Sequence, residues 1–248
     1  MSNRETLGFD RKVELAWLDA AAAAAAREGS PKEARGAIFR MLEGAVAGDD
    51  VHSGRGKTVT VLARIWITVP DGVVPTKLRA LRAIESATPA ERLAIHWAMC
   101  SATHPLFIDV AAAVGRLLRL QGNVGQAQVL RRVSESWGER STLHRAVQRL
   151  CRAFVDWGVL REGKERGVYE AAGGRLPIGV AASRLLVEGI VVGSGKPAWT
   201  VDEVVGHAAL FPFAADVDVR SLRAAPEFRV VRQGVDIDLV GLSSAEAR

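Results

Sequence analysis

The chain has 248 residues, of which 48% are hydrophobic and 25% charged, the composition of an ordinary globular protein with enough apolar material for a core. No run approaches the roughly 18 consecutive apolar residues of a membrane span, and the N-terminal segment MSNRETLGFDRK lacks the apolar core of a secretory signal. Cys100 and Cys151 lie in apolar helical patterns. We therefore expect buried, reduced thiols and a cytoplasmic protein without a membrane partner.

The net charge of +5 is mildly basic, and its distribution along the chain is more informative than its total. Residues 1–122 carry 16 basic and 13 acidic side chains, residues 123–174 carry 9 and 6, and residues 175–248 carry 8 and 9. The short middle segment is thus the most basic per residue. Because a GC-rich genome also favours arginine, the excess of 27 arginines over 6 lysines does not by itself predict nucleic-acid binding.

Residues 1–122 predict an all-helical bundle with short connections. The alanine run within residues 9–27 predicts the first helix, because alanine has the highest helix propensity. Ser30-Pro31-Lys32-Glu33 reads as a capping box that starts a second helix. The β-branched segment 58–69 is compatible with a strand or a helix, and its helical neighbours favour a helix.

Two further helices are predicted before residue 123. Thr88-Pro89-Ala90-Glu91 forms a second capping box, which predicts a helix to about Ser101 that is broken at His104-Pro105. Residues 107–120 predict the next helix, which ends at Gly122-Asn123.

The stretch SGRGKT at residues 53–58 suggests a phosphate-binding loop. That motif requires a glycine five positions before the Gly-Lys pair and a preceding strand. Val51 occupies the position, and the segment before it is predicted to be helical. We therefore interpret these residues as a polar turn.

Residues 125–157 predict two helices joined by a short turn. The first ends at Trp137-Gly138, and Ser141 or Thr142 is expected to cap the second. At 100° per residue, the second helix is strongly amphipathic. One arc is apolar and contains Leu143, Val147, Leu150, Cys151, Phe154 and Trp157, and the opposite face carries His144, Arg145, Gln148, Arg149 and Arg152.

A short hairpin with a basic turn is predicted after this helix pair. The first strand is predicted to begin at Val159, the segment 163–167 to form a turn, and residues 168–171 to form the second strand. The pattern Ser-Thr-x-x-Arg-Ala-Val, followed by Leu and then Trp-Gly-Val-Leu, resembles the recognition helix and next strand of the winged helix-turn-helix superfamily. The resemblance implies a winged helix-turn-helix over residues 123–174.

In that superfamily the second helix enters the major groove of double-stranded DNA and the wing reaches the backbone. The resemblance therefore implies a DNA-binding surface. It consists of Arg140, Ser141, Thr142, His144, Arg145, Gln148, Arg149 and Arg152 on the helix, with Lys164 and Arg166 in the wing. Glutamine and arginine can read adenine and guanine edges, and arginine also binds phosphate. The alternative is a solvated helix on a scaffold that binds only proteins, and nearby glutamates disfavour strong nonspecific DNA binding.

Residues 175–248 predict a second, smaller winged-helix-like domain, so the fold class is mainly α. Helices are predicted over 180–191, from a capping box at Thr200 to about Leu210, and over 216–224, followed by a hairpin over 228–240. Asp236 and Asp238 on the hairpin would repel phosphate, so we expect protein contact or pairing with a second copy here. Without a histidine or third acid nearby in sequence, these two aspartates do not predict a metal or acid–base site.

We expect a non-enzymatic protein with no catalytic residues, no cofactor and no metal. The five histidines show no metal-ligand spacing, and the sequence lacks CxxC, GxSxG and a GxGxxG after a strand. His96, beside Trp97, reads as a core or boundary residue.

A second resemblance covers roughly residues 30–162. The segment ERLAIHWAMCSATHPLFIDVAAAVGRLL, followed by the basic helix pair that ends in WGVL, is similar to accessory protein A of BREX phage-defence systems. That family is associated with DNA binding, and the chain beyond residue 175 extends past the resemblance. It implies an accessory factor of a defence complex with other subunits as partners. A transcriptional regulator and a protein-interaction scaffold remain open alternatives.

Overall fold

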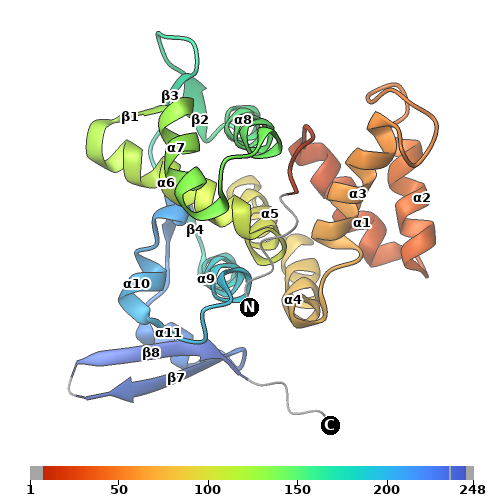
Figure 1. The fold of residues 1–248 in the computed structure, drawn as a ribbon. Coiled ribbons are helices and arrows are strands. Elements are labelled where there is room, and N and C mark those ends of the chain that lie inside the picture. The colour runs from red at the N-terminus through yellow and green to blue at the C-terminus, as the bar shows by residue number, and fades with distance from the viewer. Residues whose placement is uncertain (1–7, 235, 244–248) are drawn as a thin grey trace.

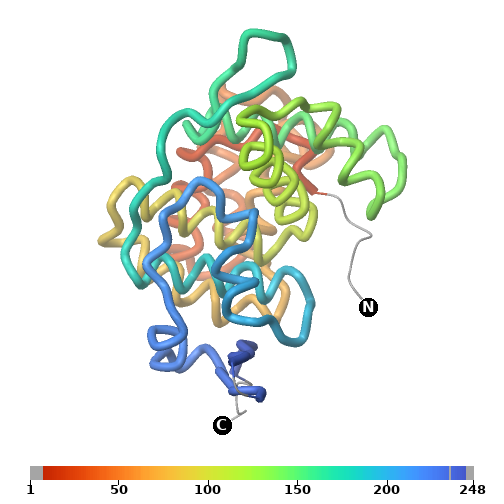
Figure 2. The backbone as a smooth tube through the Cα atoms, turned by 90° about the vertical axis from the view of Figure 1, so that its left-hand side faces the viewer, coloured from red at the N-terminus to blue at the C-terminus, as the bar shows by residue number. Residues whose placement is uncertain are grey.

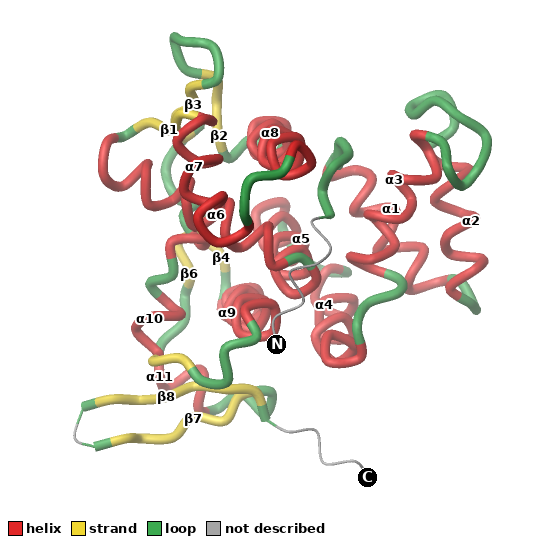
Figure 3. Tube along the Cα trace, in the orientation of Figure 1, coloured by secondary structure: helices red, strands yellow, loops and turns green. Residues whose placement is uncertain are grey.

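The computed structural model describes residues 8–234 and 236–243. The chain is mainly helical, and its strands form small sheets at the margins of the helical body (Figure 3). Two hairpins project from opposite ends of the molecule, as Figures 1 and 2 show from perpendicular directions: the turn at residues 163–167 and the hairpin that begins at residue 228.

Within the described residues, no helix has the length and apolar character needed to cross a membrane.

The N-terminal part of the described chain is helical, as predicted. Its elements are α1 Leu15–Arg27, α2 Pro31–Met41, α3 Gly54–Trp66, the 3-10 turn η1 Asp71–Val73, α4 Val74–Ile84, α5 Pro89–Thr103 and α6 Pro105–Gln121. The ambiguous segment 58–69 is helical up to Trp66. Ser30 caps α2 by accepting from the Glu33 amide, and the predicted capping box at Thr88 starts α5.

Two local predictions in this part are corrected, and one helix was missed. The first helix begins at Leu15 and not at residue 9, because Phe9 has a φ of 50° and is buried with its ring 4.9 Å from that of His104. The stretch from Gly54 is the first turn of α3 and not a polar turn, with the Ser53 hydroxyl accepting from the Gly56 amide. The helix α4, which starts at Val74, was not predicted.

The middle of the chain combines two helices with a three-stranded antiparallel sheet. Its elements are β1 Asn123–Gly125, α7 Gln126–Trp137, α8 Ser141–Asp156, β2 Leu160–Glu162 and β3 Val168–Ala171. The strand order is β1-β3-β2, so the third strand lies between the other two, and Tyr169 pairs with Val124 on one side and Glu162 on the other. The predicted hairpin is present, and β1 is an additional strand that ties α7 to it.

The C-terminal part repeats this strand order. Its elements are β4 Leu176–Ile178, α9 Val180–Ser194, β5 Trp199–Thr200, α10 Val201–Val205, the 3-10 turn η2 Ala208–Leu210, β6 Phe213–Ala215, α11 Val219–Arg223, β7 Phe228–Gln233 and β8 Ile237–Leu242. The sheet order is β5-β8-β7, while β4 and β6 form a separate parallel pair. The helix capped by Thr200 ends at Val205 and not near Leu210, and Asp218 caps a last helix shorter than predicted. Val235, part of the predicted hairpin, lies outside the described residues.

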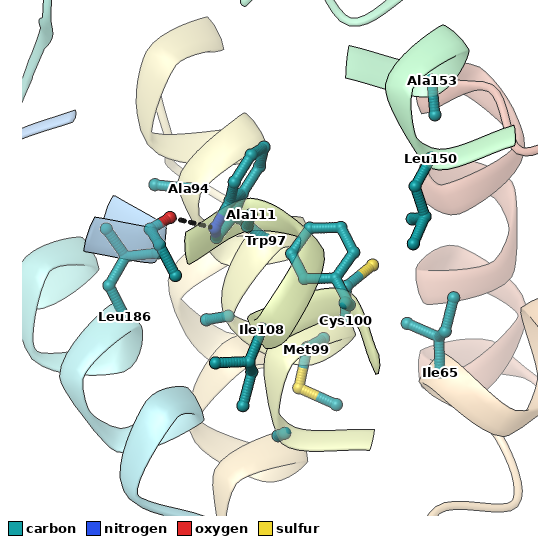
Figure 4. Packing of buried hydrophobic residues seen from close by; sticks show 14 of the residues in the cluster. Ile65, Ala94, Trp97, Met99, Cys100, Ile108, Ala111, Leu150, Ala153 and Leu186 are labelled. Carbon is teal, nitrogen blue, oxygen red and sulfur yellow. Dashed lines mark hydrogen bonds between the residues drawn. The ribbon is translucent and has the colours of Figure 1, made fainter. Parts of the chain in front are cut away.

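Trp97 on α5 is at the centre of the core. Its indole stacks on Phe154 of α8 at 4.8 Å between centroids and meets Phe107 of α6 edge-on at the same distance. Its Nε1 donates to the Ala209 carbonyl oxygen at 3.1 Å (Figure 4). The buried apolar side chains from Phe9 to Val240 form one cluster that runs through all three predicted segments.

Helices α5 and α9 approach each other closely because α9 carries glycines on the contact face. A Cβ atom at Gly189 would overlap the Ala98 carbonyl, and one at Gly193 would overlap the Ser101 carbonyl. Only glycine allows this backbone approach. The contact fixes the C-terminal part against the helix that carries Trp97.

Candidate nucleic-acid interface

Helices α7 and α8 are joined by a three-residue turn that depends on glycine. Gly138 has φ 72° and ψ 161°, a region that is essentially restricted to glycine. At the end of α7, the indole Nε1 of Trp137 donates to Asp109 Oδ2 of α6 at 2.7 Å. The turn and this anchor set the direction in which α8 leaves α7.

The predicted cap of α8 is wrong in detail. Arg140 occupies the N-cap position, with extended backbone and no side-chain cap, and Ser141 and Thr142 are the first two helical residues. All three side chains are exposed at the N-terminus of the helix. The hydroxyls therefore remain available to an external acceptor.

The predicted amphipathic pattern of α8 is confirmed. The apolar arc that was expected to face the core is buried, comprising Leu143, Val147, Leu150, Cys151, Phe154 and Trp157. The opposite face is exposed, comprising His144, Arg145, Gln148, Arg149 and Arg152. Burial raises the pKa of the Cys151 thiol to about 12, so this cysteine is a core residue and not a reactive group.

A groove of about 1060 Å³ separates α8 from the turn of the β2–β3 hairpin. Its helix side is lined by Gln148, Arg149 and Arg152, and its hairpin side by Lys164 and Arg166 together with Glu162 and Glu165. The structure thus brings together five of the residues predicted to face DNA. The hairpin is held to α7 by a hydrogen bond from the Gln126 amide to the Gly167 carbonyl at 2.8 Å.

Arg152 differs from the other cations in this groove because it is paired within the chain. Its Nε lies 3.2 Å from Asp156 Oδ1, one turn along α8, and its Nη1 lies 2.5 Å from Glu162 Oε1 on β2. The guanidinium therefore links the helix to the hairpin. It has less positive charge to offer an external anion than an unpaired arginine.

Most other cations of the middle segment have no acidic partner among the described residues. They are Arg131, Arg132, Arg140, Arg145, Arg149, Lys164 and Arg166. Among the acids, Asp156, Glu162 and Glu170 are engaged in ion pairs, which leaves Glu135, Glu139 and Glu165. Seven unpaired cations therefore accompany three unpaired acids, while Arg152 with its two carboxylates contributes a net −1 beside α8.

Arg131 and Arg132 on α7 were not predicted as site residues. Arg131 lines a second groove of about 680 Å³, between α7 and the start of α8, together with Arg140, Ser141 and His144. The sequence offered one usable signal, since two adjacent arginines precede the turn. The same groove contains Glu135 and Glu139, which moderate its potential.

One groove of the C-terminal part is acidic. A groove of about 440 Å³ near α10 and β8 is lined by Asp202, Asp218, Asp236 and Asp238. Arg223 of α11 is paired with Asp238 at 2.8 Å. No group of three or more potential ligands in the described part of the chain is placed to hold a metal ion. A phosphate backbone would be repelled here.

The contact between His96 and Asp19 belongs to the core. His96 is buried, and its Nε2 lies 3.0 Å from Asp19 Oδ1. Burial alone would raise the pKa of Asp19, but the hydrogen bonds from His96 and Arg92 outweigh it and lower that pKa. Desolvation lowers the pKa of His96 despite the carboxylate. The arrangement supports packing between α1 and α5.

Comparison of the chain with protein-family models, with curated protein sequences and with solved structures gives no match.

Proposed function

We propose that the chain binds double-stranded DNA through a winged helix-turn-helix formed by residues 123–174. The observation that carries the proposal is the groove between α8 and the β2–β3 turn, which unpaired cations line from both sides. A helix of 16 residues that buries one face and exposes arginine and glutamine on the other has the form of a recognition helix. The three-residue turn before it and the hairpin after it complete the layout.

The exposed groups divide into two kinds of expected contact. Gln148 and Arg149, in the middle of α8, have the donors and acceptors to read adenine and guanine in the major groove. Arg145, Lys164 and Arg166 are expected to bind phosphates, which adds affinity without sequence preference. Ser141 and Thr142 can donate to a phosphate at the helix N-terminus.

The biological role that fits this activity is an accessory factor of a phage-defence system or a transcriptional regulator. The acidic C-terminal part is proposed to be winged-helix-like and to contact protein, either another subunit or a second copy of the chain. No enzymatic step, cofactor or metal is part of the proposal.

The test is fluorescence anisotropy with a labelled random duplex of about 25 base pairs at about 50 and 200 mM salt. The Arg145→Ala/Arg149→Ala variant removes two unpaired cations of α8. The control Arg27→Ala/Arg82→Ala removes two exposed arginines of α1 and α4 and so matches the change in net charge. We expect salt-sensitive binding by the wild type and the control, and weaker binding by the α8 variant. The salt slope of that variant should become shallower by about 1 for each phosphate that it no longer binds.

Failure of a folded wild type to bind at the lower salt concentration would contradict the proposal, as would equal binding by the α8 variant and the wild type. The first outcome would favour the alternative class, a protein-interaction scaffold.

A further inference from the structure

A cavity of about 640 Å³ lies where the middle and C-terminal parts meet. One wall is formed by the last turns of α6, with Leu118 and Arg119, and by Gly158-Val159 before β2. The opposite wall is formed by residues 171–176, which link β3 to β4, and by residues 205–212 around η2. The volume lies within the range of small-molecule sites.

The polar groups of this cavity are of one sign. Its lining contains no aspartate or glutamate, and it includes Arg119 and Arg175. Neither arginine has a side-chain hydrogen bond or an ion-pair partner among the residues that the structure describes. His207 also lines the cavity and is neutral, because burial, followed by the charges of Arg116 and Lys196, lowers its pKa to about 4. Two uncompensated guanidinium groups therefore define the electrostatics.

The remaining lining is largely apolar. It includes Leu118, Val159, Leu176, Leu210 and Phe211. Gly173 and Gly174 lie in the same lining, and neither glycine has atoms within 4 Å of an added Cβ. A cavity with an apolar wall and two arginines suits a molecule with an anionic head and an apolar body.

We propose that this cavity binds an amphipathic organic anion, specifically a carboxylate attached to an apolar chain, with Arg119 and Arg175 holding the carboxylate. Arginine is suited to this role because its planar fork donates two parallel hydrogen bonds to a carboxylate. The apolar residues would cover the chain of the ligand. The inference does not depend on DNA binding, since it concerns a separate set of residues and is measured without DNA.

The experiment is isothermal titration calorimetry of the full chain with octanoate, using acetate and octanol as probes that lack the apolar chain or the charge. We expect octanoate to bind with one-to-one stoichiometry and both other probes to bind at least tenfold more weakly. Across shorter carboxylates, affinity should fall by about fourfold for each methylene removed from the buried part.

Two variants with the same change in net charge distinguish binding in the cavity from nonspecific attraction of an anion to a basic protein. Arg119→Gln/Arg175→Gln should lower octanoate affinity by at least tenfold, and Arg27→Gln/Arg82→Gln should retain wild-type affinity. Because both arginines of the cavity are exposed, the variant is expected to fold, which circular dichroism checks. The proposal would be overturned by absence of saturable octanoate binding, by several equivalent sites, or by an equal decrease of affinity in both variants.

Discussion

Arg152 on α8 is ion-paired with Glu162 on β2, with Nη1 and Oε1 2.5 Å apart, while its Nε contacts Asp156. The pair connects the exposed face of the helix directly to the first strand of the hairpin. It also places a carboxylate in the groove where DNA is proposed to bind. The same arginine thus helps to hold the hairpin against α8 while its own charge is largely compensated.

Replacing Glu162 by Gln should free the Nη1 end of this arginine, which keeps its contact with Asp156 through Nε, and it removes one carboxylate from the groove. If DNA occupies the groove, the variant should bind the duplex more tightly at low salt, and its salt slope should steepen by about 0.9 for one additional bound phosphate. Anisotropy titrations at several salt concentrations measure both quantities. Glu28→Gln, at an exposed site after α1, is the control with the same change in charge. An unchanged slope in Glu162→Gln would show that Arg152 acts only as a structural link.

Gly138→Ala should destabilise the turn between α7 and α8 by about 1–3 kcal/mol, because the backbone there adopts a conformation that other residues avoid. The added Cβ meets no atom within 4 Å, so the cost is conformational and not steric. Urea unfolding measures the change. Gly174→Ala is the matched control, since its φ is not positive and its Cβ position is equally open. If the two variants were equally stable, the turn would not depend on glycine at residue 138.

Arg79→Ala should be strongly destabilising because it leaves a buried carboxylate with a single partner. Glu188 on α9 is 1% exposed, accepts from Arg79 Nε at 3.0 Å and also accepts from the Thr76 hydroxyl at 2.5 Å. Because the Arg79 side chain is 35% exposed, the loss is smaller than that of a fully buried pair, and we expect about 1.5–3 kcal/mol, typical of a hydrogen bond to a charged group. Chemical denaturation should show this decrease in stability, whereas Arg82→Ala on the exposed side of α4 should stay within about 0.5 kcal/mol of the wild type.

Stability should decrease as the pH falls from about 6.5, the pKa of an unfolded histidine. Burial, together with the nearby Arg64, lowers the pKa of His104 to about 3, so below pH 6.5 the unfolded chain binds a proton that the folded chain does not. Each histidine with a lowered pKa in the folded chain decreases the free energy of unfolding by about 1.4 kcal/mol per pH unit in this range. Unfolding free energies between pH 6.5 and 4.5 test this. His207→Gln should reduce the slope.

Sequence reasoning predicted the helices well where one face is continuously apolar. The period of Leu143, Val147 and Leu150 is sufficient to define α8, because a helix of that length buries a full stripe against the core. It failed where long-range pairing decides the structure. The three residues of β1 and the parallel β4–β6 pair carry no periodic signal, and their conformation follows from the strands they meet.

The candidate site was predicted in its composition but not in its internal pairing. The exposure of Arg145 and Arg149 follows from the helical period. The neutralisation of Arg152 does not, because Glu162 reaches it only when the hairpin folds back on α8. The contribution of Arg131 depends likewise on the angle between α7 and α8. Side chains that meet across a turn are set by three-dimensional geometry.

The glycine contact between α5 and α9 has a mechanical consequence. Because the two backbones touch at Gly189 and Gly193, no layer of side chains remains that could slide or repack between them. Any shift between α5 and α9 would therefore have to move the two backbones apart, so the C-terminal part is expected to move with α5 as one unit. Residues 171–176 and 205–212, which line the cavity, lie outside this contact.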